Sequence, residues 1–256
     1  MAPSRYRTRA LASKGVAAPA IAGLLLSACG PHAAPSAIDP AMAGCVPADA
    51  ATLAGLNLET LRRSPLLPAV PQDYRAFLET FRDARSVLVS SRGSDFLFIT
   101  RGSLPGWTAA PAGLSLNGSP DLVHAATVRH APSPLLDIAE PLAARNPVWA
   151  VVRGGTTLPL QGNLANLNNL LHNADYVTLA AQLDDRVALE LAASCPSPDA
   201  ASHFEGSLRA VLGLSAAALR QPDLAGLLRS IQVKRDDRTV RASLAASPDA
   251  LGRLLH

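Results

Sequence analysis

The chain has 256 residues, enough for one domain with a substantial hydrophobic core. It carries 23 basic and 20 acidic residues, but four basic and no acidic residues lie in the first 28 positions, which leaves 19 against 20 in the remainder. This balance excludes a charge-driven role in binding nucleic acid, and an aromatic content of 4% argues against a deep aromatic-lined site for sugars or nucleotides.

Residues 1–28 have the organisation of a cleavable secretory signal peptide. Four basic side chains and no acid occupy the first 14 positions: Arg5, Arg7, Arg9 and Lys14. The apolar run over 15–28 ends in small residues and is too short to span a bilayer, which takes about 20 residues. No two arginines are adjacent within residues 1–28, so we expect export of the unfolded chain by the general secretory route.

The end of this segment carries a short motif, Leu26-Ser27-Ala28-Cys29. Placed directly after the apolar run, it resembles the lipobox of bacterial lipoproteins. The resemblance implies a diacylglycerol on the Cys29 sulfur, cleavage just before that residue, and a fatty acyl chain such as palmitate; no other cofactor is expected. It implies a lipid-anchored protein of the bacterial cell envelope. Because Gly30 follows, the resemblance favours the outer membrane, facing the periplasm, if the organism has two membranes. The alternative is a secreted protein with a chance cysteine.

Residues 29–46 contain the lipidated cysteine and a stretch rich in Ala and Pro with no periodicity. Such a composition predicts a semi-extended tether, able to hold the domain some tens of ångströms from the lipid at about 3 Å per residue. Residues 47–256 then form one domain. Cys45 and Cys195 remain after lipidation, and an exported even pair predicts a disulfide; two unpaired thiols are the alternative.

Hydrophobic periodicity and turn residues predict alternating strands and helices along the domain. Tyr74, Phe77, Leu78 and Phe81, for example, fall on one helical face. The predicted elements in chain order are a strand at 52–58, a helix at 72–84, a hairpin of 86–91 and 96–100, a strand at 114–117, helices at 120–130 and 134–144, a strand at 148–152, a helix at 162–173, a hairpin of 176–183 and 187–194, a helix through 204–212 and a second short helix, a hairpin of 231–235 and 239–245, and a final helix.

Two patterns predict an internal duplication. The hexapeptide at 82–87 parallels that at 172–177 at a constant offset of 90, and three Ser-Pro-Asp helix starts occur at 119, 197 and 247. The alternative is that this helix start recurs by convergence. The sequence therefore predicts an α+β fold of antiparallel β-hairpins with helices packed on the sheet. It further predicts a β-α-β-β-α duplication with half-repeats at about 47–131 and 146–256.

No catalytic or metal-binding motif is present. The spacings typical of serine hydrolases, zinc proteases, redox dithiols and phosphate-binding loops do not occur, and the histidines are dispersed. We therefore expect no catalytic residue and no metal, with a site assembled from distant residues as the open alternative. The acidic pairs Asp184-Asp185 and Asp236-Asp237 are interpreted as turn residues.

Three features suggest partner binding. Trp107, in a Pro/Gly loop, is either an exposed anchor or a lid on the core. Asn166, Asn169 and Asn173 line one face of the predicted helix at 162–173, which is either a binding face or a solvated one. Residues 153–157 either present N–H groups to an anion or form a turn.

The leading hypothesis is a membrane-anchored envelope lipoprotein with a non-enzymatic binding or scaffold role toward an envelope protein or polymer. The alternatives are an envelope hydrolase and a periplasmic carrier of a small or apolar ligand. Catalysis needs a cleft with convergent polar groups, and a carrier needs a sizeable apolar cavity.

Overall fold

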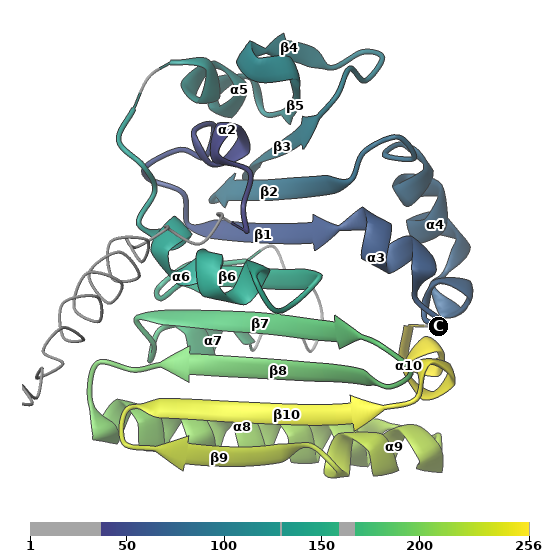
Figure 1. Ribbon diagram of the computed structural model, residues 1–256. Coiled ribbons are helices and arrows are strands. Elements are labelled where there is room, and N and C mark those ends of the chain that lie inside the picture. The colour runs from purple at the N-terminus through teal and green to yellow at the C-terminus, as the bar shows by residue number, and fades with distance from the viewer. Residues whose placement is uncertain (1–36, 129, 159–166, 256) are drawn as a thin grey trace, which may run out of the picture. The chain divides into compact units, whose positions relative to one another are not determined.

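Ten strands form one antiparallel sheet in the computed structural model, which describes residues 37–128, 130–158 and 167–255 (Figure 1). The strand order is β4-β5-β3-β2-β1-β6-β7-β8-β10-β9. The strands are β1 (Thr52–Asn57), β2 (Ser86–Arg92), β3 (Asp95–Arg101), β4 (Thr108–Ala110), β5 (Leu114–Gly118), β6 (Val148–Arg153), β7 (Tyr176–Leu183), β8 (Val187–Ser194), β9 (Gln232–Asp236) and β10 (Thr239–Ala246).

Helices connect these strands and confirm the predicted α+β class. They are α2 (Pro40–Ala43), α3 (Leu58–Arg63), η1 (Leu67–Ala69), α4 (Gln72–Glu79), η2 (Pro111–Gly113), α5 (Pro120–Thr127), α6 (Leu135–Ala143), α7 (Leu167–Leu171), α8 (Pro198–Ala218), α9 (Pro222–Arg229) and α10 (Pro248–Leu255). Each predicted hairpin is present within a residue or two of its expected bounds. The helix predicted at 72–84 ends earlier, at Glu79, and turns follow it.

The two halves of the sheet have the same connectivity. Counting outward from the centre, the first half runs β1-β2-β3-β5-β4 and the second runs β6-β7-β8-β10-β9. In both halves the last two strands are exchanged relative to chain order, and a helix follows the fifth strand. This arrangement is what a duplication predicts. By position in the two halves, α5 corresponds to α10, and both helices begin at a Ser-Pro-Asp segment.

The halves meet where β1 pairs with β6 at the centre of the sheet. Gly55 of β1 lies opposite Trp149 of β6, and a Cβ on Gly55 would lie 2.3 Å from the indole ring. The glycine therefore lets the indole lie flat on the neighbouring strand. Trp149 is 5% exposed and belongs to the core on that face of the sheet.

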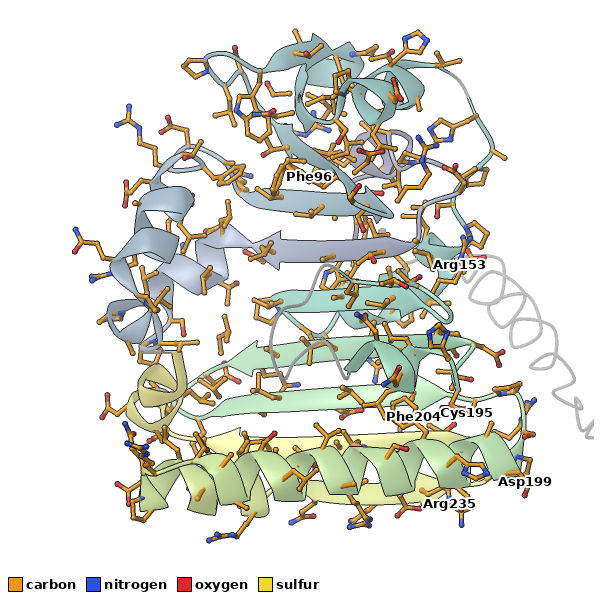
Figure 2. All side chains as sticks on the ribbon, turned by 180° about the vertical axis from the view of Figure 1, so that it is seen from behind. Phe96, Arg153, Cys195, Asp199, Phe204 and Arg235 are labelled. Atoms are coloured by element: carbon orange, nitrogen blue, oxygen red, sulfur yellow. The ribbon has the colours of Figure 1, made fainter. Side chains whose placement is uncertain are left out.

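Helices cover different faces in the two halves. We call the face that carries Leu53, Leu97 and Trp149 the front face; α2, α5 and α6 pack on it over the first half. The opposite, back face carries Val177 and Val240 and is covered by α7 and α8 over the second half. Figures 1 and 2, taken from opposite sides, show α8 behind and then in front of the strands. A third cluster joins α3, α4 and α10 at one end of the strands.

The Ser-Pro-Asp segments start helices as predicted. Helices α5, α8 and α10 begin at the prolines, and two of the three serines accept a hydrogen bond in the first turn. The N–H of Ala200 donates to Ser197 Oγ at 3.1 Å, and that of Ala250 donates to Ser247 Oγ at 3.3 Å. Ser119 Oγ instead accepts from the N–H of Phe96, which ties α5 to β3.

The tether prediction is wrong over residues 37–46. Ile38, Met42 and Val46 are each at most 4% exposed and belong to the front core, and Asp39 caps α2. Asp39 also pairs with Arg101. The short helix α2 and the residues beside it direct Ile38, Met42 and Val46 toward the sheet. A segment that was expected to be an extended tether therefore contributes three side chains to the core. The predicted lipidation site and residues 30–36 lie outside the described residues.

The predicted disulfide is also wrong, because Cys45 and Cys195 are unpaired thiols. Cys45 lies in the front core, whereas Cys195 lies in the back cluster near Phe204 (Figure 2). The sheet separates them. Burial raises the pKa of both thiols, so the reactive thiolate is disfavoured.

We expect Gly55→Ala to lower the free energy of unfolding by about 1–3 kcal/mol, because the added methyl displaces the Trp149 ring. The matched control is Gly206→Ala in α8, where a Cβ would meet open space. This substitution should stabilise the protein by about 0.4–1 kcal/mol, because alanine reduces the conformational entropy of the unfolded chain. Urea denaturation of the two variants measures both. Equal stability of Gly55→Ala and the wild type would contradict the packing described for the centre of the sheet.

The separated thiols give a second expectation. Under native conditions both should resist alkylation by iodoacetamide, and both should react once the protein is unfolded. Peptide mapping of oxidised, exported protein without reductant checks the pairing directly. A cross-linked peptide joining Cys45 to Cys195 would contradict the structure.

Candidate functional site

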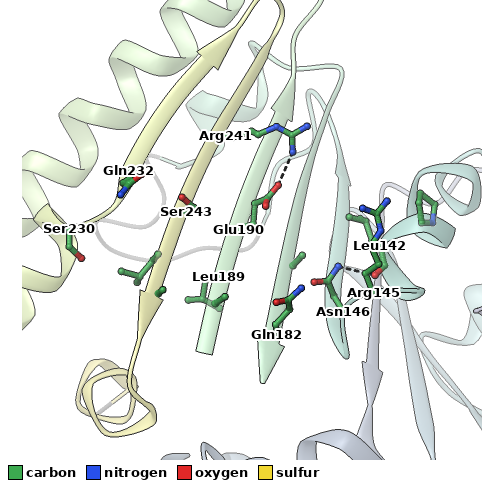
Figure 3. Close-up of a pocket in the computed structure, with 15 residues that line it drawn as sticks. Leu142, Arg145, Asn146, Gln182, Leu189, Glu190, Ser230, Gln232, Arg241 and Ser243 are labelled. Carbon is green, nitrogen blue, oxygen red and sulfur yellow. Dashed lines mark hydrogen bonds and ion pairs between the residues drawn. The ribbon is translucent and has the colours of Figure 1, made fainter. Parts of the chain in front are cut away.

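A groove of about 630 Å³ crosses the front face of the second half of the sheet (Figure 3). Its lining comes from the end of α6 and the segment after it, and from β7, β8, β10 and the start of β9. In the part of the chain that the structure describes, no helix packs over these strands on the front face. The groove is therefore open to solvent. In the first half of the sheet, by contrast, α2 and α5 cover the front face.

Small side chains form the floor of the groove. The registers place Gln182, Ala188 and Ala245 in one row across β7, β8 and β10. The next row is Ala180, Glu190, Ser243 and Gln232, running on into β9. Alternation along each strand puts all of them on the front face, opposite the back-face core. The sheet backbone is consequently close to the groove surface at the small residues of these rows, which are Ala180, Ala188, Ser243 and Ala245.

Polar side chains stand between these small ones. Glu190 accepts from Arg241 Nη1 at 2.8 Å, and both side chains of this pair are more than half exposed. Gln182, Gln232 and Ser243 are exposed, and their side chains make no hydrogen bond to the residues that the structure describes. The groove thus offers amide and hydroxyl groups, together with one charge pair that is already matched.

The end of α6 forms one wall. Pro141 lies inside the helix, which ends at Ala143, and the side-chain amide of Asn146 donates to the Leu142 carbonyl at 3.0 Å. This bond fixes the segment that carries Arg145 (Figure 3). Arg145 is exposed and has no ion-pair partner within the described ranges. The groove therefore holds one uncompensated positive charge, at its α6 side.

The lining is made of small, aliphatic, amide, hydroxyl and charged side chains. It contains no histidine, cysteine or aromatic residue, and its single carboxylate is paired with Arg241. Across residues 37–128, 130–158 and 167–255, no cluster of three metal-ligating side chains occurs. Nor is any helix within those ranges long and apolar enough to cross a membrane. The lining side chains can hydrogen-bond and pair with charge; Ser243 is the cross-strand neighbour of Glu190, and no hydrogen bond joins these two side chains among the described residues.

Trp107 is not an exposed anchor. Its ring packs edge-on against Phe81 with centroids 5.5 Å apart, and lies 6.2 Å from Phe98. It is half-buried and packs against the cluster at the ends of the strands. The loop folds back on the core, so the lid interpretation is the correct one.

The asparagine face has a largely local role where it is described. Asn166 lies outside the described residues. The side chain of Asn173 donates to the Asn169 carbonyl at 3.3 Å, at the end of α7. The side chain of Asn168 joins α7 to the segment after β6, because it accepts a hydrogen bond from the N–H of Leu158 and donates one to the Leu158 carbonyl. Partner binding by Asn169 and Asn173 stays a prediction.

The remaining candidates are turns. The N–H groups of Gly154, Gly155 and Thr156 all donate to protein carbonyls, so none of the three is free for an anion. Both acidic pairs lie at hairpin turns, and Asp237 adopts a left-handed conformation with φ of 46°. The turn interpretation is confirmed for all three segments. No sequence motif marked the groove; the only signal was the alternation in the last hairpin, which predicts a strand pair with one face toward water.

No protein-family model matches the chain, and no curated protein gives a significant match. Two solved structures of a protein named TP0453 are similar to it. Crystal form I shares 11% identity with a TM-score of 0.49, covering 84% of this chain and 96% of that one. Crystal form III shares 12% with a TM-score of 0.47, covering 85% and 98%. At these identities, no residue of the groove is assigned from the comparison.

We expect Trp107→Ala to destabilise the protein by about 1–3 kcal/mol, because it removes ring contacts with Phe81 and Phe98. Leu214→Ala, at a side chain 73% exposed, is the control and should shift stability by under about 0.5 kcal/mol. Thermal or urea unfolding measures both. A Trp107→Ala protein as stable as the control would restore the anchor interpretation.

Proposed function

We propose that this protein is a lipid-anchored protein of the bacterial cell envelope that binds another envelope component, without catalysis, in the front groove. The observation that carries the proposal is the groove itself. Among the described residues, nothing covers this sheet face, which has small residues on its floor, hydrogen-bonding side chains without partners between them and one arginine without an ion pair, Arg145. Such a surface suits recognition by hydrogen bonds and charge, with the bound molecule approaching the backbone closely.

The start of the described chain supports a position near the membrane. The N–H groups of Ala37 and Ile38 both donate to the carboxylate of Glu140 on α6, the helix that bounds the groove. Eight peptide steps separate Cys29 from Ala37. Their fully extended length is at most about 28 Å, at roughly 3.5 Å per residue. If Cys29 carries the lipid, Ala37 lies within that distance of the anchor.

The alternatives receive less support from the groove. A hydrolase would need a nucleophile activated by a general base beside the bound molecule. The one carboxylate of the lining, Glu190, is paired with Arg241 and makes no hydrogen bond to the neighbouring Ser243 hydroxyl among the described residues. A carrier of apolar molecules would need an enclosed apolar cavity, whereas exposed Gln182, Gln232 and Ser243 line an open groove. We therefore favour binding over either alternative.

The anchor is tested by metabolic labelling. Labelled palmitate should enter the wild-type protein and not Cys29→Ala, because the acyl chains depend on that residue. Ser27→Ala, beside the cysteine, is the control and should still be labelled. Labelling of Cys29→Ala at the wild-type level would refute lipidation at this site.

The groove is tested by cross-linking in cells. A photo-reactive residue placed at Ala245, on the groove floor, should give discrete cross-linked products. The same residue at Ala210, on the exposed surface of α8, should not, because α8 lies on the opposite side of the sheet. Identical patterns at the two positions, or products at Ala210 alone, would argue against the groove as the binding site.

A further inference from the structure

The shape of the groove limits what it can hold. Its two rows of side chains run at right angles to the strands, and the longer row crosses β7, β8, β10 and β9. Three strand spacings of about 4.8 Å give a length of about 14 Å. An extended chain rises about 3.3 Å per residue, so about four residues fit along the groove. The bound molecule is therefore elongated and narrow.

The polar groups are spaced along this length. Gln182 lies at the β7 side, Ser243 in the middle and Gln232 at the β9 side, and each side chain is free of partners among the described residues. An amide side chain both donates and accepts, which matches the alternating N–H and C=O groups of an extended peptide. The small floor residues Ala188 and Ala245 leave room for a backbone to lie against the sheet.

The charges indicate the sign of the bound group. Glu190 is neutralised by Arg241 at 2.8 Å, whereas Arg145 has no ion-pair partner in the described part of the chain. An anionic group at the α6 side of the groove satisfies Arg145, and a guanidinium binds carboxylate in a bidentate manner. A cationic molecule in the groove would instead be repelled by the positive charge of Arg145.

Other occupants fit less well. No aromatic residue lines the groove, so neither a sugar ring nor a base has a surface on which to stack. The exposed amide and charged side chains would be desolvated by an acyl chain or by the apolar face of a helix. Addition of a strand at β9 is disfavoured because Lys234 and Arg235 protect that edge.

We propose that the groove binds an extended acidic peptide segment, with a carboxylate on Arg145 and peptide groups on Gln182, Ser243 and Gln232. This inference rests on the proposed function, since it names the partner of the same groove. It predicts affinity that falls with ionic strength, because one ion pair at an exposed arginine is screened by salt.

The test uses the full chain in detergent and a fluorescein-labelled hexapeptide of alternating Glu and Ala, titrated by fluorescence anisotropy. The matched neutral probe has Gln in place of each Glu. The acidic probe should bind more tightly than the neutral one. Arg145→Gln should weaken binding of the acidic probe about tenfold, the loss typical of one charge-assisted hydrogen bond, and leave the neutral probe unchanged. Arg220→Gln, at another exposed arginine outside the groove, should change neither.

A second pair of variants separates this inference from the proposed function. Ala245→Trp fills the groove floor and should abolish binding of the acidic probe, whereas Ala210→Trp on α8 should preserve it; unchanged thermal midpoints show that both proteins fold. If Ala245→Trp leaves the anisotropy binding unchanged, and the photo-reactive residue gives the same cellular cross-links at Ala245 as at Ala210, the groove is not the site and the proposed function fails.

Two outcomes overturn the peptide inference alone. In the first, acidic and neutral probes bind equally and Arg145→Gln has no effect, while filling the groove still removes binding. In the second, a water-soluble short-chain phosphatidylglycerol displaces the peptide, and its binding depends on Arg145 and on an open groove. That result would identify a lipid phosphate as the anionic group in place of a peptide carboxylate.

Discussion

The pairing of β1 with β6 is the contact on which the rest of the structure depends. It joins two five-strand halves into one sheet, and Gly55 leaves space there for the Trp149 ring. The indole then packs with Leu53 and Leu97 in the front core, under α2, α5 and α6. The central contact therefore fixes both the continuity of the sheet and the position of α6, whose end forms the wall of the groove.

The groove follows from an asymmetry between halves of equal connectivity. In the first half, the helix after the fifth strand, α5, packs against β3 and β5 and leads on to α6. In the second half the equivalent helix, α10, packs against α9 and η1 at the end of the strands. The front face of β7, β8 and β10 is consequently left without the helix that covers its counterpart. A repeated strand order thus yields one covered face and one open one.

Local physics accounts for what the sequence could predict. Strand alternation, tight turns and the Ser-Pro-Asp starts depend on a few neighbouring residues, so the hairpins and most helices were found close to their true bounds. The errors concern contacts between distant residues. Cys45 and Cys195 were predicted to form a disulfide because they are the two cysteines left after lipidation. The fold decides which face of the sheet each one occupies, and it places them on opposite faces. Trp107 lies in a Pro/Gly loop whose return to Phe81 has no local signal. The groove was missed for the same reason, since its residues meet only across strands.

Small residues on a sheet face allow a helix or another molecule to pack close to the strands. On the back face of the second half, helices pack over such residues. Alanine is depleted from strands because it fills the pleated surface poorly. On the back face, Ala193 and Ala242 lie under the helical layer and are 0% and 8% exposed. The same strands place Ala188 and Ala245 on the front face, where no described segment covers them and Ala245 is exposed. A bias in composition would affect both faces alike, so it does not explain why the larger aliphatic side chains of these strands lie only at the back. The alanines on the back face are covered by helices of the same chain, and those on the front face are suited to a bound molecule.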